Sequence, residues 1–209
     1  MIYLDANATE PLRPEARVAL CAALEVTGNP ASVHGAGRAA RRLLEDAREL
    51  IAARFGAAPA DVVFTSGGTE ADALAIHALG RGRRLVVGAT EHEAVRSAAA
   101  GAMILPVDRS GVADFDALRR LLEEGGPALV CLMLANNETG TLQPVAEAAA
   151  ICRAHGALLH VDAIQAAGRV PVSLRDLGAH AMAISSHKLG GPAGAGALLL
   201  APEVSAIAP

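Results

Sequence analysis

The sequence predicts an α/β fold, in which helices flank a mostly parallel seven-stranded sheet and an N-terminal helical arm precedes it. Short apolar runs alternate with amphipathic stretches over most of the chain, as in consecutive βαβ units. Hydrophobic residues make up 52% of the sequence but aromatic residues only 2%. Small aliphatic side chains must therefore fill the interior, which suits helices packed on a parallel sheet. The 209 residues suffice for one large core.

The arm comes first. Arg13–Val26 and Gly37–Phe55 both have helical periodicity, and a polar loop, Gly28–His34, joins them. The second helix places its leucines, Ile51 and Phe55 on one apolar face. We therefore expect residues 1–60 to be an arm with helices that belong beside a smaller second domain. Residues 61–209 are expected to form the large domain.

Each apolar run of the large domain predicts a strand, and the stretches between some of them predict helices. The expected strands are Val62–Phe64, Leu85–Val87, Met103–Val107, Ala128–Leu134, Leu158–Val161, Ala181–Ser185 and Ala197–Leu200. The expected helices are Glu70–Leu79, His92–Ala99, Asp114–Glu123 and Val145–His155. Ligands of such sheets bind at the carboxyl ends of the strands, so the residues after each run are the candidate site.

Composition excludes several classes of function. The net charge is −4 and no basic tract stands out, so no nucleic-acid partner is expected. Three widely separated cysteines argue against a disulfide scaffold or a zinc site and fit a cytoplasmic protein. Residues 1–5 lack the pattern of a signal peptide. The longest apolar runs, such as Ala128–Ala135, are too short to span a membrane.

The strongest motif is Ala183–Lys188, where an apolar run ends in two hydroxyls, an imidazole and a lysine. Lys188 is the only lysine in the sequence. Partial desolvation at the end of a strand would lower the pKa of its amine and free it to attack an aldehyde. The alternative is a surface lysine with no chemical role.

Four further motifs follow strands. Gly67–Glu70 provides glycines and a helix start that can bind a phosphate. The alternative is an ordinary helix start. Glu70 itself is given no site role. Asp162 can keep a ring nitrogen protonated, or cap a helix. His92 can stack on a ring and move a proton, or lie exposed in a loop. Asn136–Gly140 can hydrogen-bond a ligand, or make a turn.

Together these motifs supply an amine, a phosphate cradle, a carboxylate, an imidazole and an amide, which is the set that holds pyridoxal 5'-phosphate. In order and spacing they resemble the cysteine desulfurases, within the class V aminotransferase group of fold-type I pyridoxal-phosphate enzymes. The stretches that carry the resemblance are Tyr3–Asp5, Gly28–His34, Phe64–Glu70, Thr90–His92, Asn136–Gly140, His160–Gln165 and Ser185–Lys188.

The resemblance implies roles for these residues. Lys188 and His92 are implied to be catalytic: Lys188 carries the cofactor, and His92 stacks on its ring. Asp162 pairs with the ring nitrogen, while Gln165 and Asn137 lie near the phenolic oxygen. The phosphate is held by Gly68, Thr69, Ser185 and His187. The implied reaction takes sulfur from L-cysteine, giving L-alanine and an enzyme persulfide for iron–sulfur cluster assembly or thiolation.

The resemblance also implies a homodimer, a sulfur-acceptor or scaffold protein as partner, and a nucleophilic cysteine beyond Pro209. The chain therefore resembles a desulfurase truncated at the C-terminal end of its large domain. Cys131 and Cys152 are instead expected to be small buried side chains. Glu10 stands where the family has a threonine.

The alternatives to a cysteine desulfurase are a selenocysteine lyase or class V transaminase, a non-catalytic binding subunit, and a nucleotide-binding module. The last would lack the usual P-loop spacing.

Overall fold

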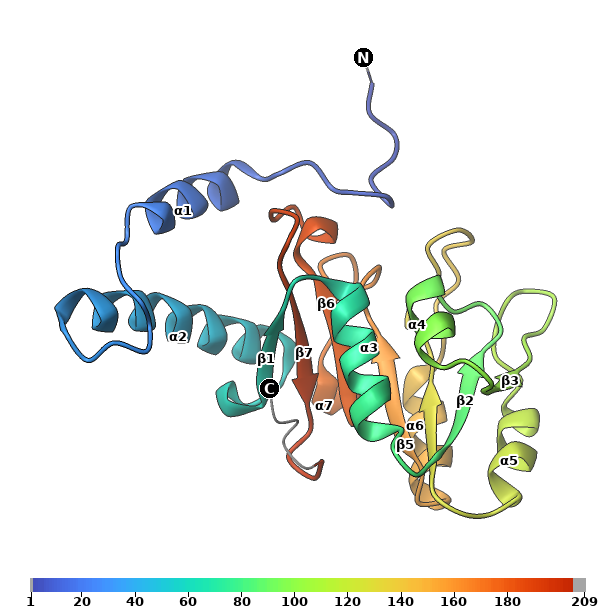
Figure 1. Cartoon of the computed structure of the whole chain (residues 1–209). Helices are drawn as coiled ribbons and strands as arrows, with labels where there is room; N and C mark the ends of the chain where they lie inside the picture. Colours follow the sequence, from blue (N-terminus) through green and yellow to red (C-terminus); the bar gives the residue numbers. More distant parts are fainter. Residues whose placement is uncertain (1, 205–209) are drawn as a thin grey trace.

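The structure is a computed structural model that describes residues 2–204. These residues form a seven-stranded sheet in the order β1-β7-β6-β5-β4-β2-β3 (Figure 1). The strands are β1 (Val62–Thr65), β2 (Arg84–Gly88), β3 (Met103–Leu105), β4 (Ala128–Cys131), β5 (Leu158–Asp162), β6 (Ala181–Ser185) and β7 (Gly196–Leu200). Strands β3, β2, β4, β5 and β6 pair in parallel, whereas β7 is antiparallel to both neighbours. The predicted fold class is confirmed.

Helices cover both faces of the sheet (Figure 1). They are α1 (Pro14–Leu24), α2 (Gly35–Phe55), α3 (Gly68–Leu79), α4 (Glu93–Ala98), α5 (Phe115–Glu123), α6 (Val145–Ala154) and α7 (Leu174–Leu177), with 3-10 turns η1 (Pro59–Asp61) and η2 (Ser186–Lys188). One buried cluster lies under α3 and α4, and the other lies under α5, α6, α7 and the end of α2. Helix α7 and the two 3-10 turns were not predicted.

Two strands are shorter than predicted. Strand β3 ends at Leu105 rather than Val107, because the chain turns after Pro106 and Val107 pairs instead with Ala113 in an isolated antiparallel bridge. Strand β4 ends at Cys131 rather than Leu134. Its extension still follows β5, since the N–H groups of Leu132 and Leu134 donate to the neighbouring strand at 3.0 and 2.8 Å. The predicted helices are confirmed to within a few residues at each end.

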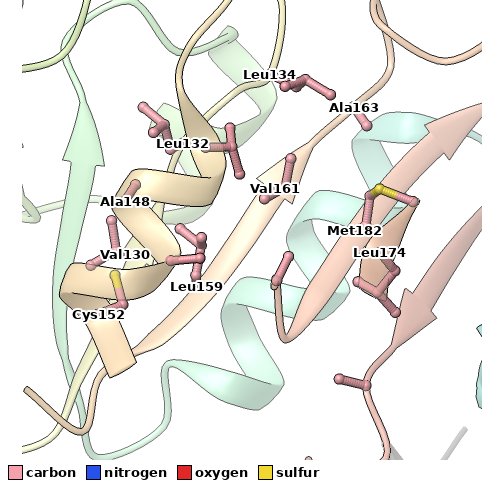
Figure 2. Close-up of a cluster of buried hydrophobic side chains, with 14 of the residues drawn as sticks. Val130, Leu132, Leu134, Ala148, Cys152, Leu159, Val161, Ala163, Leu174 and Met182 are labelled. Atoms are coloured by element: carbon pink, nitrogen blue, oxygen red, sulfur yellow. The ribbon is translucent and has the colours of Figure 1, made fainter. Parts of the chain in front are cut away.

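The two faces of β5 have different characters because side chains alternate along a strand. Leu159 and Val161 pack under α6 with Val130, Leu132 and other apolar side chains (Figure 2). His160 is also buried, and its ring reaches Asp72 of α3 on the other face. The strand thus presents an apolar surface to one layer of helices and polar groups to the other.

The N-terminal arm is attached differently from the rest. No residue of α1 is buried, and Val18 and Leu24 are 71% and 75% exposed. Before α1, the chain runs along the edge of the sheet, where the N–H groups of Glu10 and Arg13 donate to the carbonyls of His187 and Gly190. No helix within residues 2–204 is long and apolar enough to cross a bilayer.

Replacing Leu159 with alanine should lower the free energy of unfolding by about 2–5 kcal/mol, because the buried side chain leaves a cavity between β5 and α6. The control is Leu50→Ala on α2, where the leucine is 71% exposed, and it should change stability by less than about 0.5 kcal/mol. Urea denaturation measures both. Equal losses would contradict the assigned core.

Candidate functional site

A pocket of about 240 Å³ lies at the carboxyl edge of the parallel strands. Its walls come from the start of α3, the start of α4, and the segments after β4, β5 and β6. The lining residues are Gly68, Thr69, His92, Met133, Asn137, Asp162, Ile164, Gln165, Ser185, His187 and Lys188. Every site residue predicted from the sequence is among them, so the structure brings the whole predicted set together. Met133 and Ile164 add apolar surface that was not predicted.

Asp162 ends β5 and is almost fully buried. Burial and repulsion from Asp72 raise the pKa of its carboxyl to about 8, although the Ile164 N–H, 2.9 Å away, and the Lys188 charge oppose that shift. The carboxyl therefore holds a proton at neutral pH unless a cation lies beside it. A cationic ring nitrogen would supply that partner.

Lys188 ends η2, directly after the last parallel strand. Its Nζ donates to the carbonyl oxygens of Asn7 and Ala8, the latter at 2.9 Å. Partial burial, and after it the positive charge of Arg169, lower the pKa of the amine, while Asp162 and Asp5 oppose the shift. A larger share of the amine is uncharged, and so nucleophilic, than for an exposed lysine.

The side of the pocket at the start of α3 is suited to an anion. A helix start leaves its first N–H groups without acceptors in the helix. Gly68 packs closely there: a Cβ would come within 2.1 Å of Ile164 Cδ1, so a larger residue would have to displace the end of that side chain. The buried Ser185 Oγ has no hydrogen-bond partner among residues 2–204. Glu70 turns back instead and accepts from the N–H and hydroxyl of Ser66, both at 2.6 Å.

The remaining walls carry His92, Asn137 and Gln165. His92 caps α4, and its Nδ1 accepts from the Ala94 N–H at 3.1 Å. In the neutral ring the hydrogen is therefore on Nε2. The side chain of Asn136 stabilises the turn that follows it, because its Oδ1 accepts from the N–H groups of Glu138 and Thr139. Only Asn137 of this pair lines the pocket.

Three buried polar residues near the pocket were missed from the sequence. Asp72 Oδ1 lies 3.0 Å from His160 Nε2, and both side chains are fully buried. Glu91 accepts from the N–H of Met133 at 2.6 Å, and burial, with repulsion from Asp162 and Asp72, raises the pKa of its carboxyl well above the usual value. The sequence feature that could have indicated this buried polar cluster is a charged residue, Asp72, within the apolar face of α3.

None of the three cysteines lines the pocket. Cys131 and Cys152 are buried, as predicted. Burial raises the pKa of Cys152 to about 12 and that of Cys131 well above its usual value, so neither thiol ionises at neutral pH. Cys21 is exposed on α1.

The model of the family Aminotransferase class-V matches residues 2–208. An IscS-like cysteine desulfurase of Mycobacterium tuberculosis is 42% identical over 99% of this chain and 57% of its own length. A NifS-like protein from Rickettsia africae superimposes with a TM-score of 0.94 at 33% identity, over 100% of this chain and 60% of its own. The structure titled SspA in complex with cysteine has a TM-score of 0.86 at 26% identity, over 98% and 65% of the two chains. The chain thus spans little more than half the length of the curated relatives it matches.

The buried Asp162 predicts a pH dependence of stability for the ligand-free chain. The unfolded carboxyl loses its proton near pH 4, whereas the folded one keeps it to about pH 8. The folded state therefore binds more protons in this window, and the free energy of unfolding should fall as pH rises through it. Asp162→Asn should reduce that fall by about 2–5 kcal/mol. Urea titrations at both ends of the window measure it.

The matched control is Asp46→Asn, at an exposed position on α2. It should leave the difference in stability between the two pH values unchanged. The prediction for Asp162 is wrong if its asparagine variant keeps the full pH dependence of the original chain.

Proposed function

Because the chain belongs to the class V aminotransferase family, we propose that it provides the cofactor site of a pyridoxal-phosphate-dependent cysteine desulfurase. One observation carries the proposal: a single pocket gathers the only lysine of the chain, a buried carboxyl, an imidazole and, beside a helix start, a hydroxyl with no partner among residues 2–204. The relative from Mycobacterium tuberculosis, which bears the name of this activity, supports the choice of reaction.

The chemistry of the pocket residues fits the cofactor. The amine of Lys188 suits the aldehyde carbon, and Asp162 suits the ring nitrogen. His92 would stack on the ring, and Gln165 and Asn137 would interact with the phenolic oxygen. The residues proposed for the phosphate are Gly68, Thr69, Ser185 and His187. The Ser185 Oγ, which has no partner among residues 2–204, and the start of α3 support this end for the phosphate.

Pyridoxal phosphate, when bound, supplies an aldehyde carbon that amines can capture and a ring that withdraws electron density. The residues of the chain do the rest. With the cofactor bound, Asp162 would be ionised beside the ring nitrogen and would hold a proton on that atom. The uncharged amine of Lys188 would take the proton from the α-carbon of the substrate. The Nε2–H of His92 can pass a proton at the ring face.

We propose L-cysteine as the substrate, with L-alanine as the product and a persulfide as the carrier of the sulfur for iron–sulfur clusters or thiolation. The similar structure that contains cysteine supports this choice. A thiolate must receive the sulfur, and no cysteine lines the pocket. The accepting thiol is therefore proposed to come from outside residues 2–204. A cytoplasmic homodimer that works with a sulfur-acceptor protein completes the proposal.

The division at residue 60 is also a proposal. Helix α1 buries nothing in this structure, and α2 buries Ala52 and Phe55 at its C-terminal end but little before them. This attachment supports an arm that belongs to a second unit. Residues 61–204 carry all the strands and every pocket residue; residues 205–209 of the predicted large domain lie outside the described part.

Incubation of the purified chain with pyridoxal phosphate, followed by borohydride reduction, should attach the cofactor covalently at Lys188. Mass spectrometry identifies the modified peptide. Lys188→Ala should show no attachment, and Ser185→Ala should need more cofactor for half-saturation because it loses a phosphate donor. Absence of specific attachment in the original chain would contradict the proposed cofactor site.

The chain alone should release little alanine from L-cysteine when no other thiol is added, because no thiol of the pocket can take the sulfur. Alanine release should not exceed that of Lys188→Ala, measured by amino-acid analysis. Sustained release by the original chain only would show that a thiol within it reaches the substrate. Transfer of the amino group to a keto acid would instead favour a transaminase.

A further inference from the structure

A short segment of the arm, residues 5–10, contacts several of the residues that line the pocket, and we call it the strap. The side chain of Asn7 donates to the carbonyl of Asn137 at 2.9 Å. The side chain of Gln165 donates to the carbonyl of Asn7, also at 2.9 Å. The strap therefore bridges two walls of the pocket, one after β4 and one after β5.

Arg169 fastens both ends of the strap. Its Nη2 donates to the carbonyl of Ala6 at 3.2 Å and lies 3.5 Å from Oε2 of Glu10. Its Nη1 donates to the carbonyl of Gln165 at 3.2 Å, which fixes the guanidinium to the pocket wall. Nearby Ile2 and Leu4 are 84% and 89% exposed. Polar contacts rather than apolar burial thus hold this part of the arm.

The strap in turn holds the reactive amine. Lys188 donates to two of its carbonyls, those of Asn7 and Ala8. The charged groups that act on this amine come from three sides: Asp5 from the strap, Asp162 from β5, and Arg169 from the segment after β5. His187 is the titratable neighbour on η2 itself.

We propose that Arg169 is a positioning residue for Lys188, because it fixes the strap whose carbonyls orient the amine and places a second positive charge beside it. Fixing the strap and adding a positive charge have different consequences for the amine. The carbonyls keep the amine at the pocket, and the guanidinium disfavours the charged form that cannot attack a carbonyl carbon. The direction of the Lys188 pKa shift agrees with this arrangement. The significance of the role for catalysis rests on the proposed cofactor site.

The test uses the cofactor-free chain and the fact that it has one lysine. Competitive labelling with trace acetic anhydride, read by mass spectrometry of the Lys188 peptide, gives the pH profile of the reactivity of this amine. Arg169→Gln should slow labelling near pH 8 by roughly two- to fivefold at low ionic strength and leave the plateau at high pH unchanged. Added salt should shrink the difference, because the guanidinium is partly exposed.

A second variant makes the test independent of folding damage. Asp5→Asn removes a negative charge from the exposed strap and should speed labelling near pH 8, the opposite direction to Arg169→Gln. Arg175→Gln is the control: this arginine is exposed on α7 and lines a different cavity, together with Leu200 and Ala201. It should leave the profile unchanged.

Opposite shifts for Arg169→Gln and Asp5→Asn, with no shift for Arg175→Gln, support the proposal. It is overturned if Arg169→Gln leaves the profile unchanged, if it changes only the plateau, or if both variants shift the profile in the same direction. Because no cofactor is present, these outcomes are separate from borohydride trapping. The amine can be tuned by Arg169 even if pyridoxal phosphate fails to attach, and the reverse also holds.

Discussion

The site depends on the parallel pairing of β2, β4, β5 and β6. Parallel strands end at the same edge of a sheet, so His92, Asp162 and Lys188 meet although they are far apart in sequence. Helices cover both faces, so Asp162 and Ser185 at the ends of β5 and β6 are buried. The same burial that stabilises the sheet raises the pKa of Asp162 and lowers that of Lys188. Fold and reactivity have one physical origin.

Much of this arrangement could be predicted from the sequence, because buried parallel strands are nearly continuous apolar runs and the polar residues that follow them stand out. The ends of the strands were harder to predict. Leu132 and Leu134 continue the apolar run of β4 and still bond to β5, yet regular pairing stops at Cys131. Helix α7 has four residues, which is too short for any periodicity to show.

The strap and the buried acids could not be predicted for different reasons. The contacts between the strap and Lys188 use the carbonyls of Asn7 and Ala8, which every residue type possesses, so the sequence carries no mark of them. His160 lies in the apolar pattern of strand β5, and its partner Asp72 lies far away in sequence in helix α3, so only the folded chain reveals the pair. Isolated buried charges are costly, which makes such pairing necessary.

Strand β7 lies between β1 and β6 and pairs with both. Val62 of β1 lies opposite Leu199 of β7, so the first strand of the sheet can join it only through the last. During synthesis at the ribosome, β2 to β6 can assemble from their own neighbours while β1 has no edge to bind. The sheet is complete only when residues 196–200 have emerged, and until then β1 has no partner strand and can pair with other exposed strand edges.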